Sequence, residues 1–209
     1  MSQYKEIFDK NLARVEGLCA LYMSLKENNQ SDAKDYKLTD ILRAAVVFLH
    51  SSFEEYFRNV LIEWLPIRAT DETLKAIPIS INAGKKPEKL LLSDLAHYRD
   101  RTIDEIIHES VLESMKLKSF NNEGDIKSWC KKIVIEEDGF PDIKSIDKAI
   151  NRRHKIVHEA DTNREAETNK ERLQPIKPGD INSWISSYRD LVVYIDQQVD
   201  DWEKNKWRD

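Results

Sequence analysis

Residues 145–161 concentrate side chains that can transfer protons and bind phosphate. His154 and His158 are four residues apart, so on a helix they share one face. Asn151 and Asp147 precede them on that face by one and two turns. Histidine titrates near neutral pH and serves as a general acid or base. The pattern predicts acid–base chemistry, with a polar seam between packed helices as the alternative.

Arg153 interrupts the apolar face of the same helix, at a position where a leucine would be expected. The apolar side chains around it on a helical wheel are Ile146, Ala149, Ile150, Val157 and Ala160. A guanidinium in a packing face is unfavourable unless it meets an acid, backbone carbonyls or an anionic ligand. Two interpretations stay open. Arg153 either forms a structural ion pair with a neighbouring helix or is a fixed cation that, beside histidines, would suit a phosphodiester.

A metal site is another use of the two histidines. Together with Asp147 they would offer nitrogen and oxygen ligands on one helix face. Lys155 stands between them where the HExxH zinc motif has its glutamate, and two histidines underdetermine a site. We therefore predict no metal and no cofactor. The chain also has no P-loop, GxGxxG or GxSxG motif.

Helical spacing of apolar residues predicts the elements that position this stretch. We expect helices over about residues 3–27, 39–65, 87–97, 102–120, 125–135, 142–160 and 180–202. The second of these would be capped by Thr39 or Asp40 and stopped by Pro66. It is apolar nearly all round at residues 44–49, as is typical of a helix that is covered on several sides.

These elements predict an all-α bundle in a single domain, residues 1–209. Its core would come from about residues 38–65 and 142–203, with an insertion at about 66–140 and an N-terminal helix at 3–27. Connecting or irregular segments are expected at 28–36, at 66–88 (with a short extended piece at 76–81) and at 162–178. The tryptophans expected to pack in the core, rather than to stack on bases, are Trp64, Trp129, Trp184 and Trp202.

The composition of the 209 residues limits the function classes. No apolar run is long enough to span a membrane, and residues 1–10 are charged where a secretory signal would be apolar. Cys19 and Cys130 lack CxxC spacing, which is typical of reduced thiols in a cytoplasmic protein. The net charge of -5 gives no global attraction for nucleic acid, so RNA contact would need a local patch. Residues 151–158, with three cations and no acid, provide one.

The string Arg153-His154-Lys155-Ile156-Val157-His158 resembles the Arg-x4-His motif of the HEPN superfamily, including its polar second position. Residues 152–161 as a whole resemble the branch called RiboL-PSP-HEPN. Residues 42–56 are similar to the apolar helix of that branch, which ends in Phe-Glu-x-Tyr. The resemblance spans about residues 38–199, with both helices in the right order and separation.

The resemblance implies a HEPN-like helical bundle with helical and loop insertions, acting as a metal-independent endoribonuclease. Two copies would form a homodimer whose motif helices build a composite cleft on RNA. His158 would handle the proton of the ribose 2′-OH or of the leaving oxygen, and Arg153 would stabilise the phosphorane. His154 would orient the phosphate or the partner histidine. The products would be a 2′,3′-cyclic phosphate and a 5′-hydroxyl, and DNA would not be cut.

Further residues are candidates for supporting roles. On the second helix Arg43, His50 and Glu54 share one flank. Glu54 is a candidate acid to hold Arg153 or to polarise a histidine, and a surface Glu54–Arg58 pair is the alternative. The remaining candidates are Asn151 and Asp147 as supporting residues, and Arg152 and Lys155, expected on the solvent side, as RNA contacts.

By resemblance alone, the expected biology is that of a toxin of a toxin–antitoxin pair or an antiphage defence effector, with an antitoxin or defence protein as partner. The alternative is a non-catalytic HEPN module that binds nucleotides or proteins as an adaptor. Such modules usually lose the arginine or the histidine, and the presence of both Arg153 and His158 favours activity. An Arg153 locked in a buried ion pair would favour the adaptor.

Overall fold

A computed structural model describes residues 2–28, 36–79, 92, 96–164 and 171–205. The chain forms two compact units. The first contains residues 1–56, 121–123 and 138–209, and the second contains residues 57–120 and 124–137. The predicted insertion at 66–140 overlaps the second unit, while the assignment of the whole chain to one domain stays a prediction.

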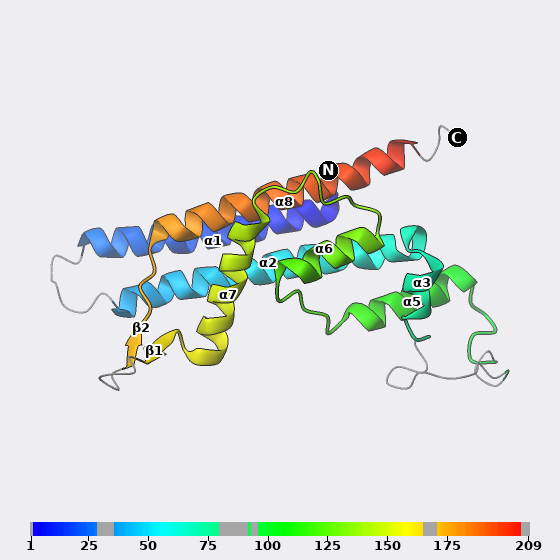
Figure 1. The fold of residues 1–209 in the computed structure, drawn as a ribbon, viewed down its shortest axis with the longest axis horizontal. Helices are drawn as coiled ribbons and strands as arrows, with labels where there is room; N and C mark the ends of the chain where they lie inside the picture. Colours follow the sequence, from blue (N-terminus) through cyan, green and yellow to red (C-terminus); the bar gives the residue numbers. More distant parts are fainter. Residues whose placement is uncertain (1, 29–35, 80–91, 93–95, 165–170, 206–209) are drawn as a thin grey trace. The chain divides into compact units, whose positions relative to one another are not determined.

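The fold is all-α, as the helical spacing predicts. The helices of the first unit are α1 (Gln3–Asn28), the N-terminal part of α2 (Tyr36–Arg68), α7 (Ile143–Glu159) and α8 (Pro178–Asn205). Figure 1 shows α1 and α8 side by side, with α7 crossing α8 steeply. The buried side chains that fill this unit include Phe8, Leu12, Leu49, Phe53, Ile146, Ile150, Tyr188 and Leu191.

The ends of α2 differ from the prediction. The helix begins before Thr39 and Asp40, whose side chains do not cap it but accept hydrogen bonds from Arg43 Nη1 at 2.7 and 3.3 Å. It also continues past Pro66 to Arg68. A proline in the last turn removes a single intrahelical hydrogen bond, so it need not end the helix where it stands.

One side of α2 stays open in the apolar stretch 44–49. Phe48 is 48% exposed, and the Arg14 guanidinium of α1 lies 5.6 Å from the centroid of its ring. The expectation that this stretch is covered on several sides therefore holds for Leu49 and its buried neighbours but not for Phe48.

The helix α7 carries the candidate chemistry. Its N-cap is Asp142, whose side chain accepts a hydrogen bond from the backbone N–H of Ser145 at 3.2 Å. The buried side chains of α7 all lie in its N-terminal half and are Ile143, Ser145, Ile146, Ala149 and Ile150. The C-terminal half has none, so Val157 and Ala160, which were expected on the packing face, are exposed. The apolar arc of α7 therefore extends past the buried half of the helix, as far as the exposed Val157 and Ala160.

The expectation of a plain loop at 162–178 is wrong in part. β1 (Thr162–Arg164) pairs antiparallel with β2 (Glu171–Leu173) in a short hairpin. Left-handed backbone at Ala160 (φ 50°) and Asp161 (φ 57°) ends α7 and turns the chain into this hairpin. Three-residue strands are too short to show an alternating pattern, so the sequence gives no strand signal here.

The second unit contains the rest of α2, α3 (Asp71–Lys75), α5 (Ile103–Met115) and most of α6 (Glu123–Lys132). The start of α5 is a capping box between Thr102 and Glu105. The region 66–88, predicted to be irregular, contains the short helix α3, which the Thr70 side chain caps. The predicted extended piece at 76–81 begins instead with a turn after α3, and its end lies outside the described residues. The predicted connector at 28–36 and helix at 87–97 also lie largely outside them.

Candidate functional site

The two motif histidines are exposed neighbours on α7. The ring centroids of His154 and His158 lie 4.5 Å apart. Asn151 is exposed one turn earlier and donates a hydrogen bond to Asp147 Oδ2 at 2.9 Å. Asp147 Oδ1 in turn accepts the backbone N–H of Glu123 at 3.3 Å. We call Asp147, Asn151, His154 and His158 the histidine row, because they line one face of α7 as the spacing predicts.

Arg153 is half-buried beside this row. Its Nε atom is buried and has no hydrogen-bond partner. Within the part of the chain that the structure describes, the guanidinium makes neither a hydrogen bond nor an ion pair, so the structural ion pair left open by the sequence is not formed there. Because the guanidinium has no protein partner there, its N–H groups are available to an anion, which makes Arg153 a candidate anion-binding group.

A buried polar cluster is formed by His50 and Glu54 of α2 and Tyr188 of α8. His50 Nδ1 is 2.9 Å from the Tyr188 hydroxyl, and His50 Nε2 is 3.6 Å from Glu54 Oε1. His50 and Tyr188 are fully buried, and Glu54 is 9% exposed. We call these three residues the His50 cluster.

The pKa of Tyr188 connects the His50 cluster to the motif helix. Burial raises this pKa well above its usual value, and the Glu54 carboxylate raises it further. Arg153 lowers it, and Asp147 raises it. The charges of both α7 residues therefore act on the phenol. Because Tyr188 stays protonated, its hydroxyl can donate to His50 Nδ1, while His50 Nε2 faces Glu54.

Sequence reasoning placed Glu54 correctly on a flank with His50 but did not find Tyr188. Glu54 is buried rather than paired on the surface with Arg58, whose guanidinium donates to the carbonyl of Lys118 at 2.8 Å. Tyr188 lies on the apolar stripe of α8, where a tyrosine is indistinguishable from a packing residue. Only its depth in the core and its contact with His50 reveal it.

Arg152, predicted on the solvent side as an RNA contact, is instead held in a buried ion pair. Its Nη2 lies 2.7 Å from Asp161 Oδ2 and 2.9 Å from the carbonyl of Gln174, and its side chain is 13% exposed. Arg43 Nε contacts the same Asp161 oxygen at 2.6 Å. The left-handed backbone after α7 brings the Asp161 carboxylate into this position. Helical spacing does not predict this contact, because Asp161 lies beyond the end of the helix. Arg152 and Arg43 therefore anchor the end of α7.

The described residues contain no group of three or more histidine, cysteine, aspartate or glutamate side chains placed to hold a metal ion. Cys19 and Cys130 are free and buried, and burial raises the pKa of both thiols. A raised pKa disfavours the thiolate, so neither cysteine is a candidate nucleophile. No helix among the described residues is both long and apolar enough to cross a membrane.

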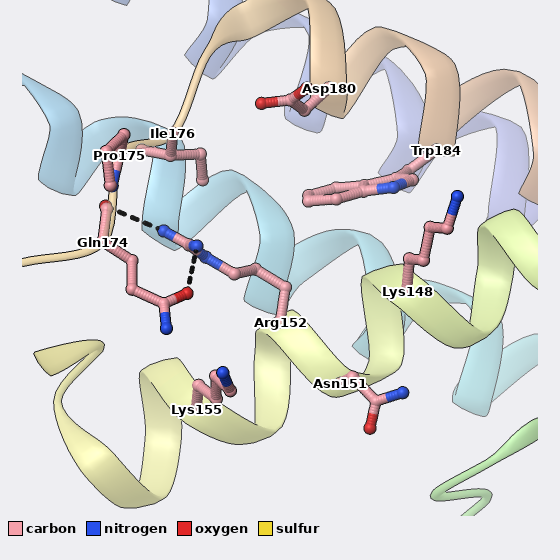
Figure 2. Close-up of a pocket in the computed structure, with 9 residues that line it drawn as sticks. All are labelled: Lys148, Asn151, Arg152, Lys155, Gln174, Pro175, Ile176, Asp180 and Trp184. Atoms are coloured by element: carbon pink, nitrogen blue, oxygen red, sulfur yellow. Dashed lines mark hydrogen bonds between the residues drawn. The ribbon is translucent and has the colours of Figure 1, made fainter. Parts of the chain in front are cut away.

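A pocket of about 300 Å³ lies on the flank of α7 next to the histidine row. Figure 2 shows its residues, which come from α7, from α8 and from the segment that precedes α8. Trp184 lines it and is half-buried, so the prediction that this tryptophan packs in the core is only partly right. Trp64 and Trp129 are buried, as predicted.

The fold and the motif helix together define a HEPN-type domain: an all-α unit that presents Arg-x4-His on one helix. The sequence profile described as RiboL-PSP-HEPN matches residues 19–201, and the chain belongs to this family. Membership places it among RNase-type or nucleotide-binding modules. Neither the curated proteins nor the solved structures contain a match to this chain.

Proposed function

We propose that this protein is a metal-independent endoribonuclease that acts as a homodimer. The observation that carries the proposal is the state of Arg153, a half-buried guanidinium without a hydrogen bond or ion pair in the described chain, beside two exposed histidines. A structural arginine would be expected to resemble Arg152, whose two Nη atoms bond to Asp161 and Gln174. An uncommitted cation beside acid–base groups suits a phosphodiester.

The reaction would be an in-line attack within the RNA chain. A His158 imidazole takes the proton from the ribose 2′-OH, and the O2′–P bond forms through a phosphorane whose charge Arg153 stabilises. The P–O5′ bond then breaks, and the leaving oxygen takes a proton from a second imidazole. The products are a 2′,3′-cyclic phosphate and a 5′-hydroxyl. DNA lacks the attacking hydroxyl and is not a substrate.

A second copy of the chain would bring a second Arg153 and a second His158 to the site. Arg153 and His158 are five residues apart, so they point about 140° away from each other around the helix axis. Val157 lies between them on the wheel and is 48% exposed, which favours burial of this face against a partner. A composite site with Arg153 and His158 from both copies would provide two imidazoles, one for each proton transfer.

The test is cleavage of a labelled, mixed-sequence single-stranded RNA in the presence of EDTA. We expect cleavage by the wild type and none by His158→Ala. Lys144→Ala is the matched control, because Lys144 is exposed near the start of the same helix. Equal cleavage by the wild type and His158→Ala would contradict the proposal.

The biological role we propose is that of a toxin or antiphage effector acting on cytoplasmic RNA, with an antitoxin or defence protein as regulator. It is supported by family membership and by the intact Arg153 and His158 pair. Induced expression in a bacterial host should stop growth with the wild type and not with His158→Ala at equal protein levels. Growth arrest by both would attribute toxicity to something other than RNA cleavage.

A further inference from the structure

The pocket beside the histidine row combines an aromatic face with positive charge. Lys148, Arg152 and Lys155 of α7 line one side of it, and Trp184 and Asp180 of α8 line the other. Figure 2 shows the Trp184 indole extending from α8 toward the Arg152 side chain, with Lys148 on the facing helix. Three cations against a single carboxylate make the lining net positive.

The two lysines are the available charges of this pocket. Within the described residues neither ammonium group forms an ion pair or a side-chain hydrogen bond, and Lys148 is exposed. Arg152 is occupied by Asp161, and Asp180 accepts the backbone N–H of Lys177 at 3.1 Å. Lys148 and Lys155 are seven residues apart, so they stand about 10 Å apart along α7.

An aromatic ring that faces separated cations suits single-stranded nucleic acid, because bases can stack on the ring while lysines contact phosphates. Asn151 also lines the pocket and bonds to Asp147 of the histidine row. The pocket and the histidine row are therefore continuous along α7.

We propose that this pocket binds one nucleotide of the substrate RNA next to the cleavage position, with its base against Trp184 and its flanking phosphates at Lys148 and Lys155. The assignment of RNA as the ligand rests on the proposed ribonuclease function. The pocket itself is separate from the atoms that would cut the strand.

The experiment measures binding without cleavage, using a fluorescein-labelled 2′-O-methyl RNA dodecamer of mixed sequence, whose blocked 2′-oxygen cannot attack. Trp184→Ala should weaken binding about tenfold, within the range measured for loss of one stacked base, and Trp184→Phe should restore most of it. The double variant Lys148→Ala/Lys155→Ala should bind more weakly. It should also flatten the slope of log K against log salt by about 1.4, the value for two lost phosphate contacts. Lys144→Ala should change neither quantity.

Unchanged RNA affinity in Trp184→Ala and in the double lysine variant, both melting as the wild type does, would overturn the proposal. If Trp184→Ala fails to fold, the lysine variant decides, because Lys148 is exposed and Lys155 is not buried. Binding of 5′-AMP that Trp184→Ala abolishes, with RNA affinity unchanged by the same substitution, would also overturn the proposal, because it would assign the pocket to a free nucleotide. Trp184-dependent RNA binding by a protein that cuts no RNA would refute the proposed ribonuclease and leave this site standing.

Discussion

Arg152 and Arg153 are adjacent on α7, and we expect them to respond in opposite ways to replacement by alanine. The Arg152 guanidinium lies 2.7 Å from Asp161, whose side chain is completely buried. Arg153 makes no hydrogen bond or ion pair within the described residues. The first substitution should therefore act on stability and the second on activity.

The size of each effect follows from these contacts. Removing one partner of a buried ion pair costs about 3–5 kcal/mol because the other charge is left uncompensated. Asp161 would keep Arg43 at 2.6 Å, so we expect the lower end, about 3 kcal/mol, for Arg152→Ala. Arg153→Ala breaks no ion pair and should lower the free energy of unfolding by less than about 1 kcal/mol. Its RNA cleavage should fall about 10²- to 10³-fold, the loss typical of one group that stabilises charge in a transition state.

The assay is denaturant unfolding followed by circular dichroism, performed on both variants beside RNA cleavage at saturating substrate. Lys144→Ala serves as the control for loss of a cation from α7, and it should match the wild type in both measurements. An Arg153→Ala protein that unfolds as readily as Arg152→Ala would show that Arg153 is structural. An Arg153→Ala protein with full activity would refute its role in charge stabilisation.

Three further predictions concern metal, assembly and pH. Cleavage should survive EDTA, and a loss that zinc restores would point to a metal enzyme instead. Light scattering should give about twice 24.5 kDa, and Val157→Asp should yield an inactive monomer, since it places a charge on the exposed apolar position between Arg153 and the histidines; an active monomer would rule out the composite site. Because the pKa of Tyr188 is raised in the folded state, the unfolded chain loses this proton first as pH rises above about 10, so stability falls there. At pH 8 the free energy of unfolding of Tyr188→Phe should be about 1 kcal/mol below that of the wild type, because the bond to His50 is lost. Since phenylalanine does not titrate, this difference should be smaller at pH 11. A deficit that is the same at both pH values would contradict the burial of this phenol.

The motif helix could be predicted from the sequence because its pattern is local. Periodicity alone sets Asp147, Asn151, His154 and His158 on one face, and the structure places them there. The same reasoning failed for Arg152, since the charge that captures it, Asp161, comes from beyond the helix and arrives through a left-handed turn. A helical wheel contains no information about the chain after the helix ends.

Contacts between helices were harder to predict than the helices themselves. His50 and Tyr188 are distant in sequence and meet only when α2 and α8 pack together. Trp184 has the spacing of a core residue, but it lies at the edge of the packed region, where the segment before α8 leaves a pocket open. Such positions depend on how completely one element covers another. Hydrophobic spacing predicts which face of a helix is turned toward the core, but not how much of that face the neighbouring elements bury.

The most direct test of the central claim is the chemistry of the cut ends. Mixed-sequence RNA and DNA of the same sequence are incubated with the wild type and with His158→Ala in EDTA, and the termini are identified by mass spectrometry. We predict 2′,3′-cyclic phosphate and 5′-hydroxyl ends from RNA with the wild type only, and intact DNA throughout. Cleavage of DNA, or RNA ends bearing 5′-phosphate and 3′-hydroxyl groups, would contradict attack by the 2′-hydroxyl and with it the proposed roles of Arg153 and His158.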